Sequence, residues 1–172
     1  MTYDSRGRMT SRNVGGETTV YTYDLAGQLT GATSRSYTYD AEGNPVQVDG
    51  RTSTYNLANR LTRLADGATT VASYKLNGLG QRVAKTVGST TTRYVYDEQG
   101  RLTGEYQSNG TLIQETIWLD DLPIATLRPT GTGNPTPIAV YYVHADHLGS
   151  PRAITRPGDL SSYNRIWCTT MS

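Results

Sequence analysis

The sequence predicts an all-β fold made of repeated antiparallel β-hairpins that form an open, curved or spiralling sheet. Composition is the first observation, because the 172 residues include 13 Tyr and 27 Thr but no Phe, and aromatic and β-branched residues favour strands over helices. The second observation is a Tyr-Asp octamer that recurs along the chain. The third is that each octamer has the residues of a tight hairpin turn at its centre.

Seven octamers begin at residues 3, 23, 39, 55, 76, 96 and 106, and the first reads Tyr-Asp-Ser-Arg-Gly-Arg-Met-Thr. The intervals between these starts vary from 10 to 21 residues, which is too irregular for a strict solenoid. Hairpins joined by outer connections of variable length accommodate such intervals. We therefore expect each octamer to be the end of one β-hairpin.

The turn of each octamer is predicted from its Asp-x-x-Gly segment. A type I turn prefers Asp at its first position and Gly at its fourth, where Gly adopts a positive φ in a G1 bulge. Where the Gly is lost, Asn59 takes its place, and Asn tolerates the left-handed region better than most side chains. The predicted turn residues are Asp4, Gly7, Asp24, Gly27, Asp40, Gly43, Asn56, Asn59, Asn77, Gly80, Asp97 and Gly100.

One face of each hairpin is predicted to be apolar. A three-residue loop places Tyr23 opposite Leu29, so the Tyr and Leu of an octamer share a face. A second tyrosine two residues earlier extends this face into a row of tyrosines across successive hairpins. We interpret this row as tyrosines that pack in the core, with a sugar-binding platform as the alternative. The predicted apolar face comprises Tyr3, Tyr21, Tyr23, Leu29, Tyr37, Tyr39, Tyr55, Leu61, Tyr94, Tyr96, Leu102 and Trp118.

Charge and cysteine content exclude several classes of protein. The formal net charge is +1, and the basic residues are dispersed, so no stripe suited to nucleic acid is present. Asp4 with Arg8, and Asp97 with Arg101, are expected to form cross-strand opposite-charge pairs at a hairpin rim, which fix register and stabilise little if exposed. Cys168 is the single cysteine, which excludes an internal disulfide framework and a Cys-rich zinc site. No apolar run is long enough for a membrane span, and the first residues do not resemble a signal peptide.

The pattern changes after the last octamer. Residues 115–127 read as longer, more apolar strands around a Pro-containing turn. Residues 128–137 are rich in Pro, Gly and Thr and are expected to form a mobile loop, and residues 138–144 read as a further strand.

His144, Asp146 and His147 are the only clustered candidates for metal ligands. On a strand, His144 and Asp146 would share one face and His147 would lie on the other. A zinc site needs at least three such ligands together. We interpret the cluster as a hydrogen-bonded structural His-Asp arrangement and keep a metal site as the weaker alternative.

The octamers and the C-terminal segment together resemble a known family. The octamers are similar to YD repeats, and residues 141–152 are similar to the signature of the Rhs repeat-associated core. The core residues that carry this likeness are Tyr142, His144, Asp146, His147, Leu148, Gly149, Pro151 and Arg152. The resemblance is to bacterial Rhs and wall-associated proteins, whose relatives include toxin-complex C subunits and teneurins. It implies a hollow β-shell that encloses a toxic C-terminal domain, and a secreted or cell-surface location.

The expected organisation has three parts: a YD-repeat hairpin array over 1–113, a repeat-associated core segment over 114–167, and an atypical, truncated tail over 168–172. The self-cleavage motif that the resemblance implies after the core is not matched, so we expect neither catalysis nor a cofactor. The predicted function is that of a non-enzymatic shell fragment whose partners are the remainder of the shell and the enclosed toxin, with open sheet edges prone to self-association. The alternative is a cell-surface module in which exposed tyrosines bind a glycan or a partner protein.

Overall fold

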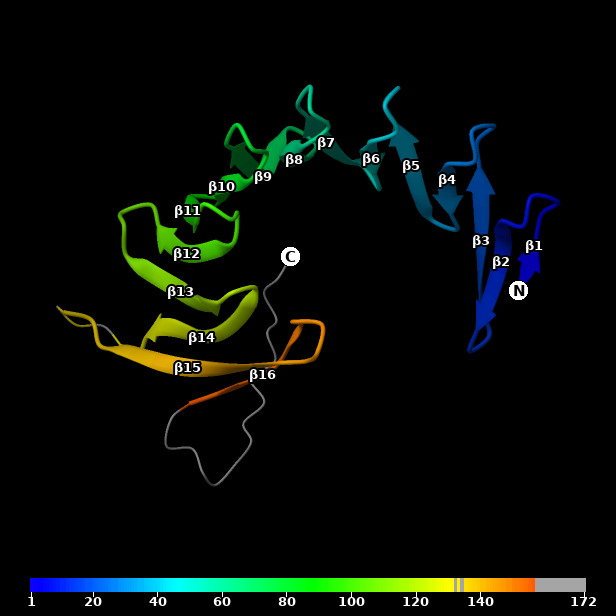
Figure 1. The fold of residues 1–172 in the computed structure, drawn as a ribbon. Helices are drawn as coiled ribbons and strands as arrows, with labels where there is room; N and C mark the ends of the chain where they lie inside the picture. Colours follow the sequence, from blue (N-terminus) through cyan, green and yellow to red (C-terminus); the bar gives the residue numbers. More distant parts are fainter. Residues whose placement is uncertain (132, 134, 157–172) are drawn as a thin grey trace. The chain divides into compact units, whose positions relative to one another are not determined.

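The computed structural model describes residues 1–131, 133 and 135–156 (Figure 1). It confirms the all-β prediction, because these residues form sixteen strands and no helix. The strand order follows the chain from β1 to β16, and every described strand pair is antiparallel. The predicted tail over 168–172, and the end of the predicted core segment, lie outside the described residues.

The first compact unit spans Met1–Lys75. Its strands are β1 (Thr2–Tyr3), β2 (Met9–Val14), β3 (Glu17–Tyr23), β4 (Leu29–Ala32), β5 (Arg35–Tyr39), β6 (Pro45–Val48), β7 (Arg51–Tyr55), β8 (Leu61–Asp66) and β9 (Thr69–Leu76), whose last residue already belongs to the next unit. Octamer turns join β1 to β2, β3 to β4, β5 to β6 and β7 to β8, and two-residue turns make the connections between these hairpins.

The second compact unit begins at Leu76. Its strands are β10 (Arg82–Val87), β11 (Thr90–Tyr96), β12 (Leu102–Gln107), β13 (Leu112–Leu119), β14 (Leu122–Pro129), β15 (Ile138–Ala145) and β16 (Pro151–Thr155). The unit boundary falls in the fifth octamer, where Leu76 replaces the tyrosine. The predicted division after residue 113 stays a prediction.

The seventh octamer differs from the others in its place in the sheet. It joins β12 to β13, whereas the sixth joins β11 to β12. Successive turns of an antiparallel meander lie at opposite ends of the strands. The Tyr106 turn and the Asp97 turn therefore lie at opposite ends of β12. This placement explains the short interval of ten residues between the two octamers.

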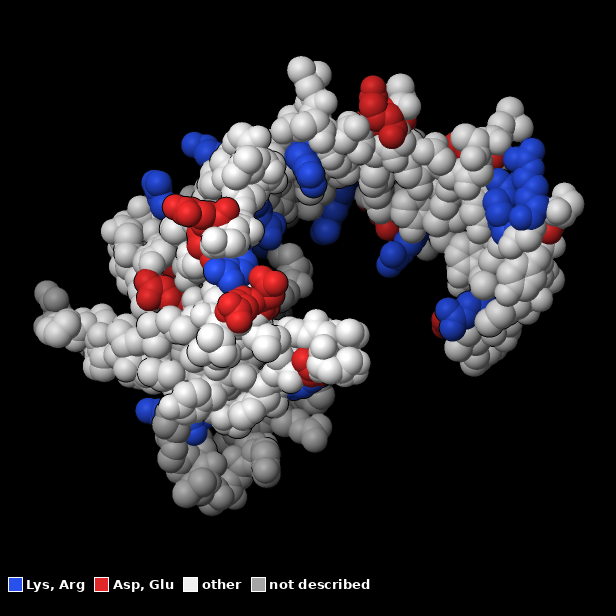
Figure 2. Space-filling view, in the orientation of Figure 1, with Lys and Arg blue, Asp and Glu red and all other residues white. Residues whose placement is uncertain are grey.

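Few side chains are fully buried. Among the described residues, the buried apolar side chains are Ala65, Ala72, Pro123, Ala125 and Ile154, while larger ones such as Tyr142 are half exposed. Acidic and basic side chains both occur along the face shown in Figure 2. Most other apolar side chains in the strands are partly buried or exposed, so hydrogen bonds within and between hairpins add to the stability that partial burial provides.

Candidate functional site

The turn of the first octamer has a closely hydrogen-bonded geometry. The Gly7 N–H donates to the Asp4 carbonyl at 3.0 Å, and the Asp4 N–H donates to the Arg8 carbonyl at 2.9 Å. The Asp4 Oδ1 atom accepts from the backbone N–H groups of Arg6 and Arg8, both at 2.9 Å. Gly7 has a φ of 77°, a value that favours glycine. The aspartate side chain thus satisfies the amides that the turn leaves unpaired.

The other predicted turn residues lie in the same arrangement. The two backbone hydrogen bonds recur in the turns that begin at Asp24, Asp40, Asn56, Asn77 and Asp97. The fifth octamer residue has a positive φ in each of them: Gly27, Gly43, Asn59, Gly80 and Gly100. The observed register pairs Tyr23 with Leu29, as the loop length predicts.

An eighth turn of this kind was missed by the sequence reasoning. The Gly149 N–H donates to the Asp146 carbonyl at 3.0 Å, and the Asp146 N–H donates to the Ser150 carbonyl at 2.9 Å. Ala145 pairs with Pro151, so alanine occupies the tyrosine position of an octamer. The Asp-x-x-Gly spacing of Asp146 and Gly149 was the available signal. It was not recognised as an octamer because Ala145 takes the place of the tyrosine.

The core-signature residues are distributed around this eighth turn. Tyr142 and His144 lie on β15, His147 and Leu148 are exposed in the turn, and Pro151 and Arg152 begin β16. The Arg152 Nε–H donates to the Asp146 Oδ2 atom at 2.9 Å.

The weaker metal-site alternative receives no support from the described residues. His144 Nε2 lies 2.9 Å from Thr155 Oγ1, rather than pairing with Asp146, whose carboxylate faces the turn amides and Arg152. Within the described residues, no three His, Cys, Asp or Glu side chains are grouped so that they could hold a metal ion.

Aromatic donors connect several hairpins to the preceding one, although the fifth octamer begins with Leu76 and has no such donor. The first tyrosine of an octamer donates its hydroxyl to the carbonyl of the seventh residue in the octamer before it. These hydrogen bonds are Tyr23 to Met9 at 2.8 Å, Tyr39 to Leu29 at 2.9 Å, Tyr55 to Pro45 at 3.2 Å and Tyr96 to Arg82 at 3.0 Å. The Trp118 Nε1–H donates to the Leu102 carbonyl at 3.0 Å and continues the series. We call this set of contacts the aromatic ladder.

The sixth octamer residue makes a second connection between hairpins. The Arg8 Nε–H donates to Asp4 at 2.7 Å, its guanidinium lies 4.6 Å from the centre of the Tyr23 ring, and its Nη1–H donates to the Asp24 carbonyl at 3.4 Å. Arg101 repeats this arrangement with Asp97, Trp118 and the Asp120 carbonyl. Both predicted Asp-Arg pairs are therefore present, and their arginines are half-buried between successive turns, where a cation can contact a ring face.

Hydrogen bonding lowers the pKa of several turn aspartates. The backbone N–H of Arg8 is the main cause at Asp4, the side-chain amide of Asn44 at Asp40, and the backbone N–H of Ser150 at Asp146. At Asp97, desolvation opposes the shift, but the backbone and guanidinium of Arg101 outweigh it and the pKa is lowered.

Acid is expected to destabilise the fold through these aspartates. Their folded pKa lies below the ordinary value of 3.8, so their stabilising contribution is complete above that value and is lost as the pH falls through the folded pKa. The urea midpoint should hold between about pH 7 and 5 and fall below about pH 4, as followed by circular dichroism.

An Asp40→Asn variant serves as the control, because asparagine keeps the Oδ1 acceptor, as the native Asn56 and Asn77 turns do. Its midpoint should fall less below about pH 4. A wild-type midpoint that stays constant down to about pH 3 would contradict the assignment.

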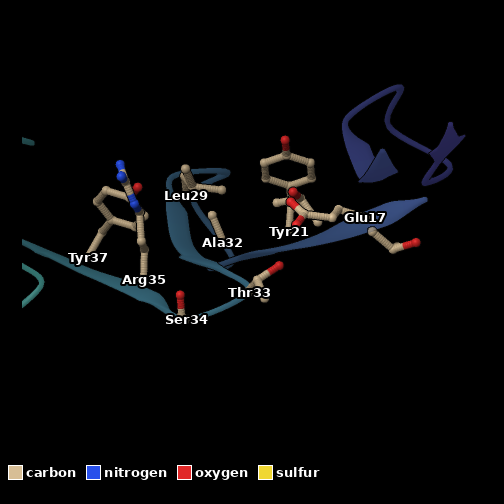
Figure 3. A pocket seen from close by; sticks show the side chains of 10 residues that line it. Glu17, Tyr21, Leu29, Ala32, Thr33, Ser34, Arg35 and Tyr37 are labelled. Atoms are coloured by element: carbon tan, nitrogen blue, oxygen red, sulfur yellow. The ribbon is translucent and has the colours of Figure 1, made fainter. Parts of the chain in front are cut away.

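A groove of about 680 Å³ lies over β3, β4 and β5. Tyr21 pairs with Ala32 and Ala32 pairs with Arg35, so the three share a face, and Tyr37 lies two residues further along that face. Figure 3 shows Tyr21 and Tyr37 on opposite sides of Ala32. Among the described residues, no group hydrogen-bonds to the hydroxyls of these two tyrosines, in contrast to Tyr23 in the aromatic ladder.

Hairpins that repeat one turn geometry and bond successively through an aromatic ladder define a YD-repeat shell protein. Residues 1–115 match the family model described as Teneurin YD-shell. Because this match covers more than half of the sequence, the chain belongs to the teneurin YD-shell family. No curated protein matches the chain. Within the described residues, no helix has the length and apolar character to cross a membrane.

Proposed function

We propose that this chain is a structural, non-enzymatic part of the wall of a protein shell. The observation that carries the proposal is the aromatic ladder, because it joins successive hairpins within each unit by a repeated contact. Such nearest-neighbour contacts allow a wall to extend by adding hairpins. Membership of the YD-shell family supports the same role.

The proposal extends to what the shell encloses. In longer relatives, the resemblance of the sequence to Rhs proteins implies a toxic C-terminal domain inside the shell. The partners of this segment are then the other shell segments and that domain. A secreted or cell-surface location belongs to the same proposal.

Limited proteolysis of the complete polypeptide that contains this segment tests enclosure. The C-terminal domain should resist cleavage in the native protein and become sensitive in a variant that combines Tyr23→Phe with Tyr39→Phe. The matched control combines Tyr21→Phe with Tyr37→Phe, whose hydroxyls bond to no described residue. Cleavage of the C-terminal domain at equal rates in the native protein and in its isolated form would exclude enclosure.

A second candidate function is recognition of a glycan or partner protein at the cell surface. The groove between Tyr21 and Tyr37 favours it, because a concave site with aromatic walls and polar groups is suited to ligands. Glycan-array binding that is lost in Tyr21→Ala and Tyr37→Ala, with unchanged circular dichroism, would support this function. An absence of binding to glycans, cell-wall preparations and partner proteins would leave the shell function alone.

A further inference from the structure

We propose that the groove between Tyr21 and Tyr37 binds a cationic side chain, lysine or arginine, of a partner polypeptide. This inference rests on the second candidate function, recognition by the groove, and adds the chemistry of the ligand. Three features of the groove carry it: its shape, its two half-buried aromatic rings and its charge.

The shape of the groove follows from one small residue. Ala32 lies directly opposite Tyr21, while in the next hairpin Val48 lies directly opposite Tyr37. Neighbouring strands are about 4.8 Å apart, so alanine leaves a hollow between tyrosines that stand two strands apart. Leu29 also lines the groove, and Figure 3 shows it between Tyr21 and Tyr37 in this view. A side chain that enters beside Leu29 can contact the tyrosine rings.

The half-buried rings of Tyr21 and Tyr37 are suited to a contact that the protein makes elsewhere with its own cations. The Arg8 guanidinium lies 4.6 Å from the centre of the Tyr23 ring, and the Arg128 guanidinium lies 5.6 Å from that of Tyr141. Within the described residues, Tyr21 and Tyr37 have no such arginine. An external cation over these rings would gain the same attraction.

The charge of the groove favours a cation over an anion. Glu17 lines it and is exposed, and no cation among the described residues pairs with Glu17. Arg35 also lines the groove, but its Nε lies 3.6 Å from Asp49 Oδ2, so the positive charge is partly balanced. The Glu17 carboxylate complements a lysine or arginine side chain, whereas a neutral sugar would form no ion pair with it.

Titration of the intact chain with N-acetyl-arginine amide, observed by NMR of its tyrosine rings, tests the inference. Signals of Tyr21 and Tyr37 should shift saturably, and the neutral isostere N-acetyl-citrulline amide should bind about fivefold more weakly. Glu17→Gln should weaken arginine binding about threefold, and Ala32→Leu, which fills the hollow, should abolish it. Tyr142→Leu changes a half-exposed tyrosine outside the groove and should leave binding unchanged.

Three results would overturn the cationic ligand. Equal affinity for the citrulline probe would show that charge plays no part. Shifts with methyl β-glucoside but not with the arginine probe would replace the cation by a sugar and leave recognition by the groove intact. Absence of saturable shifts with every probe would exclude the cation, and the glycan-array result would then decide recognition separately.

Discussion

Replacing Trp118 with alanine is expected to lower the free energy of unfolding of the second unit by about 3 kcal/mol, the lower end for truncation of a large aromatic side chain. Trp118 is half-buried, donates to the Leu102 carbonyl at 3.0 Å, and has the Arg101 guanidinium 5.8 Å from its ring centre. Alanine removes the hydrogen bond, the ring contact and the packing together. Urea unfolding followed by circular dichroism measures the loss.

Two variants separate the parts of this effect. Trp118→Phe keeps an aromatic ring but removes the donor, so it should cost only about 1 kcal/mol. Leu119→Ala alters the neighbouring residue, which is 60% exposed, and should cost less than about 0.5 kcal/mol. If Trp118→Ala is no more harmful than Leu119→Ala, the tryptophan does not belong to the ladder that stabilises the sheet.

Local features of the fold were predictable because each octamer specifies its own turn. Asp4 and Gly7 supply an acceptor for turn amides and a residue with positive φ, and these needs are met within the octamer itself. Tyr23 lies opposite Leu29 for the same reason, since loop length fixes register. None of this depends on how one hairpin packs on the next.

Features that depend on neighbouring hairpins were not predictable in the same way. The tyrosine hydroxyl bonds join residues 10 to 14 positions apart, and their only sequence signal was the presence of Tyr with no Phe. The end of the strands at which the Tyr106 turn lies depends on the number of preceding strands. The groove depends on Ala32 lying between two tyrosines after three strands have paired.

The double variant Tyr23→Phe with Tyr39→Phe is expected to lower the free energy of unfolding of the first unit by about 2 kcal/mol. Each change removes one hydroxyl that donates to a carbonyl of the preceding octamer, at 2.8 and 2.9 Å, and one such bond contributes about 1 kcal/mol. The two sites do not share a partner, so the losses should add. Denaturant unfolding by circular dichroism provides the measurement.

The double variant Tyr21→Phe with Tyr37→Phe is the matched control, because it removes two hydroxyls from the same two strands, β3 and β5. These hydroxyls have no hydrogen-bond partner among the described residues, so the free energy of unfolding should change by less than about 0.5 kcal/mol. Equal losses in the two double variants would mean that the hydrogen bonds of Tyr23 and Tyr39 add nothing specific, and no loss in either would mean that the tyrosines stabilise the sheet through their rings alone. A loss confined to Tyr23 and Tyr39 would instead establish that their hydroxyls join one hairpin to the next, which is the property a shell wall requires.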